Sequence, residues 1–190
     1  MSVVVERRFE ATVFPTFYAM FREFRALEAG EVDAACLGAA GPVLGRSARI
    51  TNLTWEIDAE HLERAYAIRR AILVNDFFAV AAGVPHLVEG DLVSINRGTR
   101  DRGSPIGILG AGTGLGEAIV VPDGRRWRVV PTEGGHTDFG PRDAQQRELL
   151  SVLEARYGHV SYERLLSGHG LVNIFTFLRD RKYRRETAPR

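Results

Sequence analysis

The chain has 190 residues, of which 45% are hydrophobic and 26% are charged, proportions that are ordinary for a globular protein of one large or two small domains. Its 25 Lys and Arg balance 24 Asp and Glu, which excludes a strong overall field for nucleic acid, so we expect no nucleic-acid partner. The single cysteine excludes an internal disulfide, and no apolar run approaches the length of a membrane span, so we expect no membrane partner and a reducing, cytoplasmic location.

The amino-terminal part of the sequence predicts alternating strands and helices, the order typical of an α/β layer. Residues 3–11 have the pattern of a strand. Pro15 then introduces a helix that stops near Gly30, and the apolar residues of this helix recur three and four positions apart. These residues are Phe17, Met20, Phe21, Phe24 and Leu27.

A short buried strand is predicted at Ala34–Ala39, and Cys36 within it is expected to be a buried, unreactive thiol. Residues 43–50 predict a further strand with a turn at Gly45. Asp58 is expected to cap a second helix. The apolar face of that helix consists of Leu62, Ala65 and Tyr66.

A polar pair follows the next strand, which is predicted at residues 71–74. Asn75 and Asp76 lie at the carboxyl end of this strand, and a helix is predicted to continue over residues 77–83. Ligands of α/β sheets gather at such strand ends, so the pair is a candidate site. The alternative is that Asp76 serves only as the N-cap of the helix.

A domain boundary is expected between Pro85 and Asp91. The sequence therefore predicts one domain over residues 1–86 and a second over residues 87–190. In the second domain, residues 92–96 have the pattern of a strand, and residues 97–104 form a charged loop that contains glycine.

Residues 106–139 predict three strands around a glycine-rich turn, with Thr113 at its centre and glycines at 110, 112, 114 and 116. Glycine supplies positive φ and close backbone approach, and a turn rich in bare N–H groups suits phosphate. The dinucleotide fingerprint is excluded because its third glycine would fall on Leu115 or Glu117, and the Walker motif is excluded because no Lys follows. A glycine-rich hairpin without a ligand is the alternative.

Glu133 and His136 follow the third strand in a glycine-rich loop. They could form a metal pair, a sugar-binding pair or solvated loop residues. A metal pair lacks a convincing third ligand, since Asp138 nearby adds little, so no metal site is predicted. Glu163 lies in the first turn of a short helix, where the helix dipole favours a carboxylate whatever its function.

The carboxy-terminal part predicts helices. Asp143 and Gln146 form a capping box for a helix that ends at Gly158, and Ser161 caps a short helix that ends near Gly168. The apolar residues of the first helix are Leu149, Leu150, Leu153 and Tyr157, and those of a third are Leu171, Ile174, Phe175 and Leu178. Residues 179–190 are basic and are expected to be a solvated, fraying tail.

Six segments, in order, resemble the non-zinc bacterial glucokinases of the hexokinase/actin-like ATPase superfamily. They are AACLGAAGPV, ITNLTW, ILVNDFFAV, ILGAGTGLGEA, PTEGGHTDFGPR and HVSYERLLSGHGLVNIF. The resemblance implies an α/β, ribonuclease H-like fold with two lobes of mixed sheets and flanking helices. It also implies transfer of the γ-phosphate of ATP to the six-position hydroxyl of glucose, the entry to glycolysis.

The resemblance also implies a role for each matching residue. Asp76 matches the general base that takes the proton from the attacking sugar hydroxyl. The residues that match sugar ligands are Asn75, Glu133, His136 and Glu163. The residues that match the second phosphate motif, which meets ATP with Mg²⁺ between the phosphates, are Gly112, Thr113 and Gly114.

The chain departs from the family at both ends. No Asp-x-Gly-Gly-Thr motif, the first phosphate loop of the family, occurs between Met1 and Gly30, and the sequence stops at Arg190, before the adenosine-binding segment. His169 stands where the family usually has Pro. The sequence therefore predicts a truncated chain that self-associates, as a dimer, through an exposed sheet edge and uncovered apolar surface.

Three functions remain open from the sequence. The first is an ATP-dependent glucokinase, for which the activity of this chain alone stays open. ADP and polyphosphate are further candidate phosphoryl donors for it. The second is a non-catalytic glucose-binding fragment or remnant. The third is a related acyl- or sugar-phosphate enzyme on the same scaffold.

Overall fold

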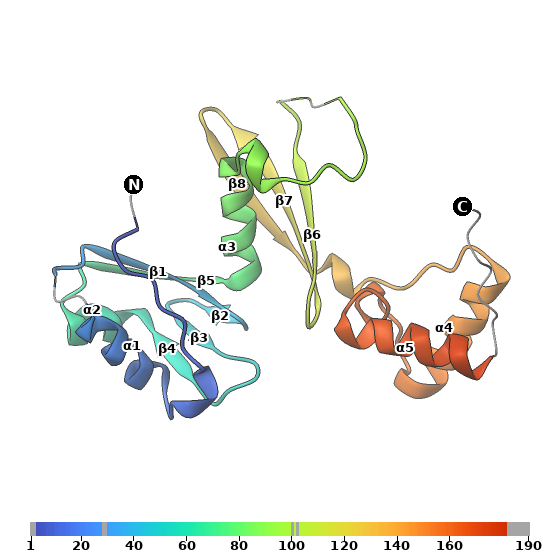
Figure 1. Cartoon of the computed structure of the whole chain (residues 1–190), viewed down its shortest axis with the longest axis horizontal. Coiled ribbons are helices and arrows are strands. Elements are labelled where there is room, and N and C mark those ends of the chain that lie inside the picture. Colours follow the sequence, from blue (N-terminus) through green and yellow to red (C-terminus); the bar gives the residue numbers. More distant parts are fainter. Residues whose placement is uncertain (1–2, 28–29, 100, 102, 182–190) are drawn as a thin grey trace. The chain divides into compact units, whose positions relative to one another are not determined.

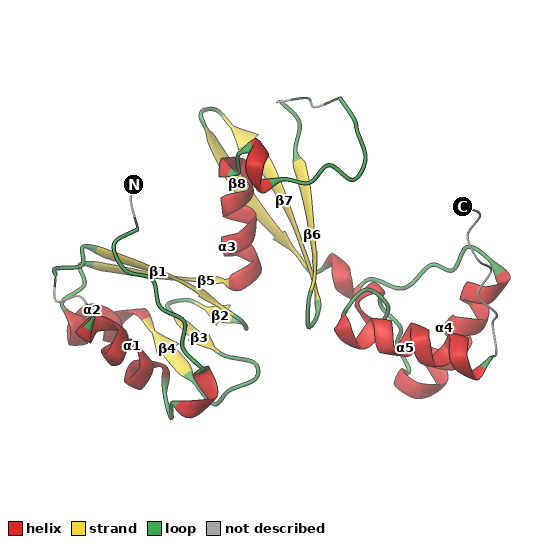
Figure 2. Cartoon of the chain, viewed as in Figure 1, coloured by secondary structure: helices red, strands yellow, loops and turns green. Residues whose placement is uncertain are grey.

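The structure is a computed structural model that describes residues 3–27, 30–99, 101 and 103–181 (Figure 1). Its contacts divide the chain into two compact units, Met1–Val84 and Pro85–Arg190. Helices accompany one parallel and two antiparallel sheets (Figure 2), which confirms the predicted α/β class. Within the described residues, none of the helices is long and apolar enough to cross a membrane.

The first unit is built on a parallel pair of strands, β1 (Ala34–Ala39) and β5 (Arg70–Asn75), in register from Ala34 opposite Arg70 to Ala39 opposite Asn75. Two helices, α1 (Phe17–Ala26) and α2 (Ala59–Tyr66), share an apolar core with one face of this pair. The core includes Phe17, Ala39, Trp55, Ile57, Leu62, Ala71 and Leu73. Because both helices carry their apolar residues at helical spacing, their predicted positions are confirmed.

The other face of the β1–β5 pair is only partly covered, by α3 (Asp76–Gly83) near Gly38, and the predicted burial of Cys36 was wrong. Cys36 is exposed, and Ile72, which pairs with it across the strands, is 41% exposed. Successive side chains of a strand point to opposite faces, so covering one face buries only alternate residues. The apolar composition of the strand did not distinguish a strand covered on two faces from one covered on a single face.

A small antiparallel sheet joins the strand pair to α2. It consists of β2 (Val43–Leu44), β3 (Ser47–Arg49) and β4 (Glu56–Asp58), in that order. The predicted turn at Gly45 is present, with φ of +62°, whereas β4 was not predicted. Three residues are too few to show the alternation that identifies a strand in sequence.

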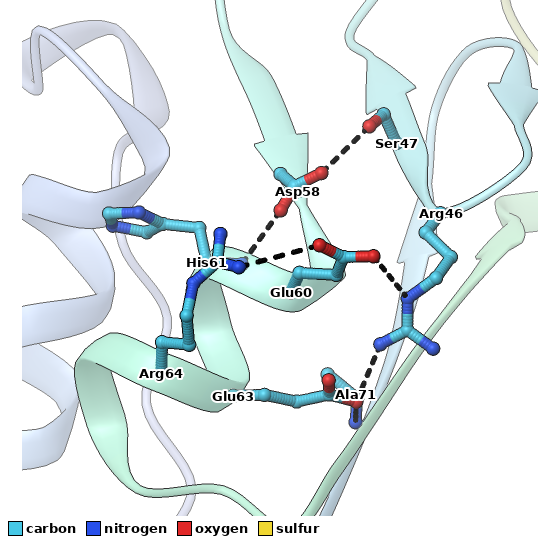
Figure 3. Close-up of polar contacts among 8 residues, drawn as sticks. All are labelled: Arg46, Ser47, Asp58, Glu60, His61, Glu63, Arg64 and Ala71. Carbon is cyan, nitrogen blue, oxygen red and sulfur yellow. Dashed lines mark hydrogen bonds and ion pairs between the residues drawn. The ribbon is translucent and has the colours of Figure 1, made fainter.

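A polar network ties this sheet to α2 and β5 (Figure 3). Asp58 is the predicted N-cap of α2: its Oδ1 accepts from the His61 amide at 2.7 Å, and its Oδ2 accepts from the Ser47 hydroxyl at 2.9 Å. Glu63 accepts from the Arg46 guanidinium at 2.6 Å and from the Ala71 amide at 2.9 Å. The network therefore links β3, β4, α2 and β5 through two carboxylates.

The second unit consists of an antiparallel sheet and two helices. The sheet has the order β6 (Ile106–Ala111), β7 (Leu115–Asp123), β8 (Arg126–Thr132), which confirms the three predicted strands. The helices α4 (Ala144–Tyr157) and α5 (Gly168–Asp180) pack around an apolar core. This core contains Leu149, Leu153, Val160, Leu165 and Phe177.

The predicted ends of α4 are confirmed. Asp143 accepts from the Gln146 amide at 2.7 Å, and the Gln146 side chain accepts from the Arg142 amide at 2.9 Å. Gly158 follows the helix with φ of +75°. The helix predicted after Ser161 is instead a single 3-10 turn, Tyr162–Arg164, and Ser167 caps α5 through its hydroxyl.

Two predicted strands are absent from the described residues, at 3–11 and at 92–96. Both segments contain β-branched residues that face solvent: Val3 is 78% exposed and Ile95 is 98% exposed. A strand requires a neighbour to hydrogen-bond with, and neither segment has one here, so the local pattern alone was insufficient. The predicted basic tail lies outside the described residues from position 182 onward.

The polar network of the first unit makes its stability depend on pH. The pKa of Asp58 is lowered from its ordinary 3.8 by the His61 amide and then by the Ser47 hydroxyl. The pKa of Glu63 is lowered from its ordinary 4.5 by the Ala71 amide and then by Arg46. A carboxyl group with a lowered folded pKa stabilises the fold above its unfolded pKa, and this contribution is lost as the pH falls through the folded value.

We therefore expect the free energy of unfolding of the first unit to be constant near neutral pH and to fall below pH 4.5, the ordinary pKa of Glu63. Urea titrations at a series of pH values, followed by the fluorescence of buried Trp55 in a Trp127→Phe background, measure it. Glu63→Gln should flatten the profile, and Gln at the exposed Glu6 serves as the matched control. Equal profiles for both variants would contradict the assignment.

Candidate functional site

Asn75 and Asp76 lie where β5 passes into α3 (Asp76–Gly83). Asn75 is the N-cap: its Oδ1 accepts from the amides of Phe77 at 3.0 Å and Phe78 at 3.3 Å. Asp76 is the first helical residue, and its Oδ1 accepts from the Phe77 amide at 2.8 Å. Capping is thus done by the neighbouring asparagine, and the Asp76 side chain lies exposed at the amino end of the helix.

A glycine in the neighbouring strand allows α3 to begin at this position. A Cβ placed on Gly38 would lie 3.3 Å from the Ala79 Cβ and 3.5 Å from the Asp76 Cα. The backbone of β1 and the first turn of α3 therefore approach closely because residue 38 has no side chain. The side-chain Nδ2 of Asn75 also donates to the Gly41 carbonyl at 3.5 Å. The strand β1, the loop after it and β5 therefore together fix the positions of Asn75 and Asp76.

The predicted glycine-rich turn joins β6 to β7 with Thr113 exposed at its tip. The Gly112 amide donates to the Gly114 carbonyl at 2.8 Å, and the Gly168 amide, at the start of α5, donates to the Gly112 carbonyl at 2.9 Å. Among the residues that the structure describes, the amides of Thr113 and Gly114 have no hydrogen-bond partner. The turn therefore contains two consecutive N–H groups without a partner among the described residues.

The glycines of this turn do not have the positive φ that the sequence predicted. Positive φ is found, within the described ranges, at Gly45, Gly124 and Gly158 among the glycines, and so not in this turn. Close approach is the reason that holds: a Cβ on Gly114 would fall against the carboxylate of Glu163. The glycine therefore makes room for an acidic side chain from a distant part of the chain.

Three predicted sugar ligands converge beside this turn. Glu133 precedes, and His136 ends, the 3-10 turn Gly134–His136, whereas Glu163 lies in the 3-10 turn Tyr162–Arg164. The His136 Nε2 is 3.7 Å from a Glu133 oxygen, and its Nδ1 is 3.9 Å from the Glu163 Oε1. The other oxygen of Glu163, Oε2, accepts from the Leu115 amide at 3.0 Å.

These three side chains differ in how much of them faces water. Glu133 is 90% exposed, His136 is 60% exposed and Glu163 is 30% exposed. The group is therefore open to a ligand from the Glu133 side and closed behind Glu163, where the turn lies. Two carboxylates and an imidazole in this arrangement can accept or donate hydrogen bonds to neighbouring hydroxyl groups.

Backbone hydrogen bonds lock the two 3-10 turns together. The Phe139 amide donates to the Val160 carbonyl at 2.9 Å, and the Tyr162 amide donates to the Thr137 carbonyl at 3.1 Å. Gly135 is buried so close to the Leu115 carbonyl that any Cβ would collide with it. The glycine-rich turn and both 3-10 turns therefore pack together in the second unit.

One acidic residue near this assembly was not predicted as a site residue. Glu117 lies on β7, and its carboxylate is close to the place that a Cβ on Gly134 would occupy. Residues two apart in a strand point to the same face, so Leu115 and Glu117 share one. Because Leu115 begins the strand after the glycine-rich turn, this alternation was the sequence signal that could have placed Glu117 on the same face.

The grouping of His, Cys, Asp and Glu side chains bears on metal binding. Within the described ranges, no three His, Cys, Asp or Glu residues are grouped so that they could hold a metal ion. Magnesium is commonly held by one or two carboxylates together with substrate phosphates, rather than by a protein cage.

The fold matches that of known sugar kinases. The crystal structure of glucokinase from an Antarctic psychrotroph superposes with a TM-score of 0.80 and 27% identity, covering 95% of this chain and 56% of that one. The crystal structure of Balamuthia mandrillaris glucokinase in complex with glucose gives a TM-score of 0.67 at 23% identity, covering 90% of this chain and 53% of that one. The predicted hexokinase-like fold is thus confirmed.

The sequence comparisons assign the chain to a single family. Residues 2–190 match the family Glucokinase, and the chain belongs to this family. Glucokinase of a Nostoc species is 38% identical over 188 residues, which cover 97% of this chain and 55% of that protein. Glucokinase of a Synechocystis species is 39% identical over 192 residues, covering 96% and 54%. The chain spans about half the length of these curated relatives.

The packing of Gly135 gives a prediction for the stability of the second unit. Gly135→Ala should lower its free energy of unfolding by about 1–3 kcal/mol, because the added methyl group meets the Leu115 backbone and the backbone has to move. Hydrogen exchange at the amide of Val120, which is buried in β7, measures this change.

Gly107→Ala is the matched control, because a Cβ on Gly107 meets nothing within 4 Å, and we expect a change within about 0.5 kcal/mol. If Val120 exchanges at the same rate in both variants, the close approach at Gly135 is not a constraint on the fold.

Proposed function

We propose that the protein is a glucokinase that transfers the γ-phosphate of ATP to the six-position hydroxyl of glucose. One observation supports this most strongly: Glu133, His136 and Glu163 converge beside a turn with two free amides, in a chain of the glucokinase family. Since the chain spans about half the length of its relatives, the activity has to be measured on this chain itself.

The sugar side of the reaction is assigned to the acidic and imidazole groups. The carboxylates of Glu133 and Glu163 would accept hydrogen bonds from sugar hydroxyls, and His136 between them would donate or accept one. Asn75 would add a further hydroxyl contact. An epimer with a misplaced hydroxyl would leave one of these groups unpaired, which is the physical basis of selectivity in such sites.

The phosphate side is assigned to Gly112, Thr113 and Gly114. Consecutive backbone N–H groups with a hydroxyl form a concavity that binds anions, and the free amides of Thr113 and Gly114 support this role. Phosphoryl transfer depends mainly on positioning and on charge stabilisation. Mg²⁺ would arrive bound to the phosphates of ATP, where it would neutralise part of their charge.

The general base is assigned to Asp76. Its carboxylate is exposed, and its Oδ1 already accepts from one backbone amide, which leaves Oδ2 to accept the proton of the attacking hydroxyl. Asn75 caps α3 in its place, so the role as base does not compete with a structural one. General-base assistance of this kind contributes roughly 10²–10⁴-fold to the rate.

A coupled assay for glucose 6-phosphate tests the proposal. We expect turnover with ATP and glucose, and a decrease of about 10²–10⁴-fold in kcat for Asp76→Asn with little change in glucose affinity. Asn at Asp123, the last residue of β7, is the matched control and should retain full activity. Equal loss in both variants would rule out Asp76 as the base.

Calorimetric titration separates the alternatives. Glu133→Gln should weaken glucose binding about tenfold or more, the expected loss for a hydrogen bond to a charged group, whereas Gln at exposed Glu154 should not. Binding of glucose without ATP would support a non-catalytic glucose-binding protein. Unchanged glucose affinity in Glu133→Gln would favour a related enzyme of the same scaffold with another substrate.

We also infer that the protein acts in the cytoplasm, where ATP is available, and that two copies associate. Exposed apolar side chains support the association: Leu171, Val172 and Phe175 on α5 are 68%, 61% and 64% exposed. Patches of this kind often mark interfaces. Sedimentation velocity should show a dimer that Phe175→Glu dissociates, and a wild-type monomer at all concentrations would contradict the inference.

A further inference from the structure

Glu163 lies between His136, another predicted sugar ligand, and the glycine-rich turn. Its two carboxylate oxygens face different partners. Oε1 is 3.9 Å from the His136 Nδ1, whereas Oε2 accepts from the Leu115 amide at 3.0 Å. Leu115 is the residue that follows the turn, at the start of β7. One side chain from a different part of the chain thus contacts both sides of the site.

The turn has few other attachments. Within the described part of the second unit, the turn is held by the hydrogen bond inside it, from the Gly112 amide to the Gly114 carbonyl, and by the Gly168 amide, which donates to Gly112. The first bond shapes the turn, and the second fixes its β6 side. On the β7 side, Leu115 pairs with Ala111 of β6, and the Glu163 carboxylate is the side chain that accepts from the Leu115 amide.

The partial exposure of Glu163 allows a ligand to affect the hydrogen bond between its carboxylate and the Leu115 amide. The Glu163 side chain is 30% exposed, so its carboxylate is neither fully buried nor free in solvent. A sugar hydroxyl bound at Oε1 would restrict the carboxylate and so reduce the freedom of Oε2 as well. Ordering by one ligand lowers the entropic cost of ordering for the next, which is a form of positive coupling.

We propose that Glu163 positions the glycine-rich turn through the Leu115 amide, and that glucose binding at the same carboxylate stiffens this turn for the phosphates of the nucleotide. The inference rests on the proposed function for the identity of the ligand. It adds a second role to Glu163, because the carboxylate acts on the nucleotide only through the backbone of the turn. The two oxygens divide these roles between them.

Hydrogen exchange of the Leu115 amide, measured by NMR on the full chain, tests the first part. Glu163→Ala should speed this exchange about tenfold or more, because the amide loses a charged acceptor. The exchange of the buried Val120 amide should not change. Ala at exposed Glu154 is the matched control. Unchanged exchange at Leu115 in Glu163→Ala would overturn the positioning role.

Glucose is the probe for the second part. Saturating glucose should slow exchange at Leu115 about threefold in the wild type, as ordering of the carboxylate predicts. Glu163→Gln retains one acceptor oxygen, so its Leu115 amide should stay protected without ligand but lose the response to glucose. A full glucose response in Glu163→Gln would overturn the division of roles between the two oxygens.

Gly114→Ala tests the same contact with the carboxylate left intact. Its methyl group would fall against the Glu163 carboxylate, which can swing away because it ends a flexible side chain. The Leu115 amide should then exchange faster, as in Glu163→Ala. Normal exchange with Ala at this position would show that the contact does not constrain the turn.

The shifts of the His136 ring report glucose binding independently of Leu115. If these shifts appear while exchange at Leu115 stays constant, the coupling is refuted and the proposed function survives. If glucose produces no shift at His136, the proposed function fails and with it the coupling, and Glu163→Ala alone then decides the positioning role.

Discussion

Close approach of backbone to backbone, and of carboxylate to backbone, is the constraint on which the site of the second unit depends. Gly114 makes room for Glu163, Gly134 for Glu117, and Gly135 for the Leu115 carbonyl. In each case a Cβ would displace an atom that a separate segment brings to the site. The backbone contact at Gly135 therefore lets the hairpin and a 3-10 turn pack closely, while Gly114 and Gly134 leave space for two carboxylates, and the resulting assembly places the polar groups.

The first unit reaches its geometry by a different route, through polar side chains that end helices and join strands. Asn75 caps α3 and leaves the Asp76 carboxylate exposed, while Asp58 caps α2 and also binds Ser47. Each cap satisfies amides that the first turn of a helix leaves without partners. The same chemistry that begins a helix thus presents an acidic group at a strand end.

Much of this could be predicted from the sequence, and the limits have physical causes. Periodicity identified α1, and capping residues identified α2 and α4, because these signals are local. Long-range contacts decided the rest: residues 92–96 have no strand partner among the described residues, and Cys36 lies on a part of the sheet that stays exposed. The convergence of Glu163 with Gly114 depends on residues far apart in sequence, so the sequence predicted close approach at the glycines but not the side chain that approaches, and its prediction of positive φ was wrong.

A crystal structure of the chain grown with glucose is the most direct test of the central claim, that the second unit holds a sugar against the glycine-rich turn. We expect sugar hydroxyls within hydrogen-bonding distance of Glu133, His136 and Glu163, about 2.6–3.2 Å between heavy atoms, with the Glu163 Oε2 still on the Leu115 amide. Glucose bound elsewhere in the second unit, or bound only after Glu163 leaves Leu115, would contradict the claim.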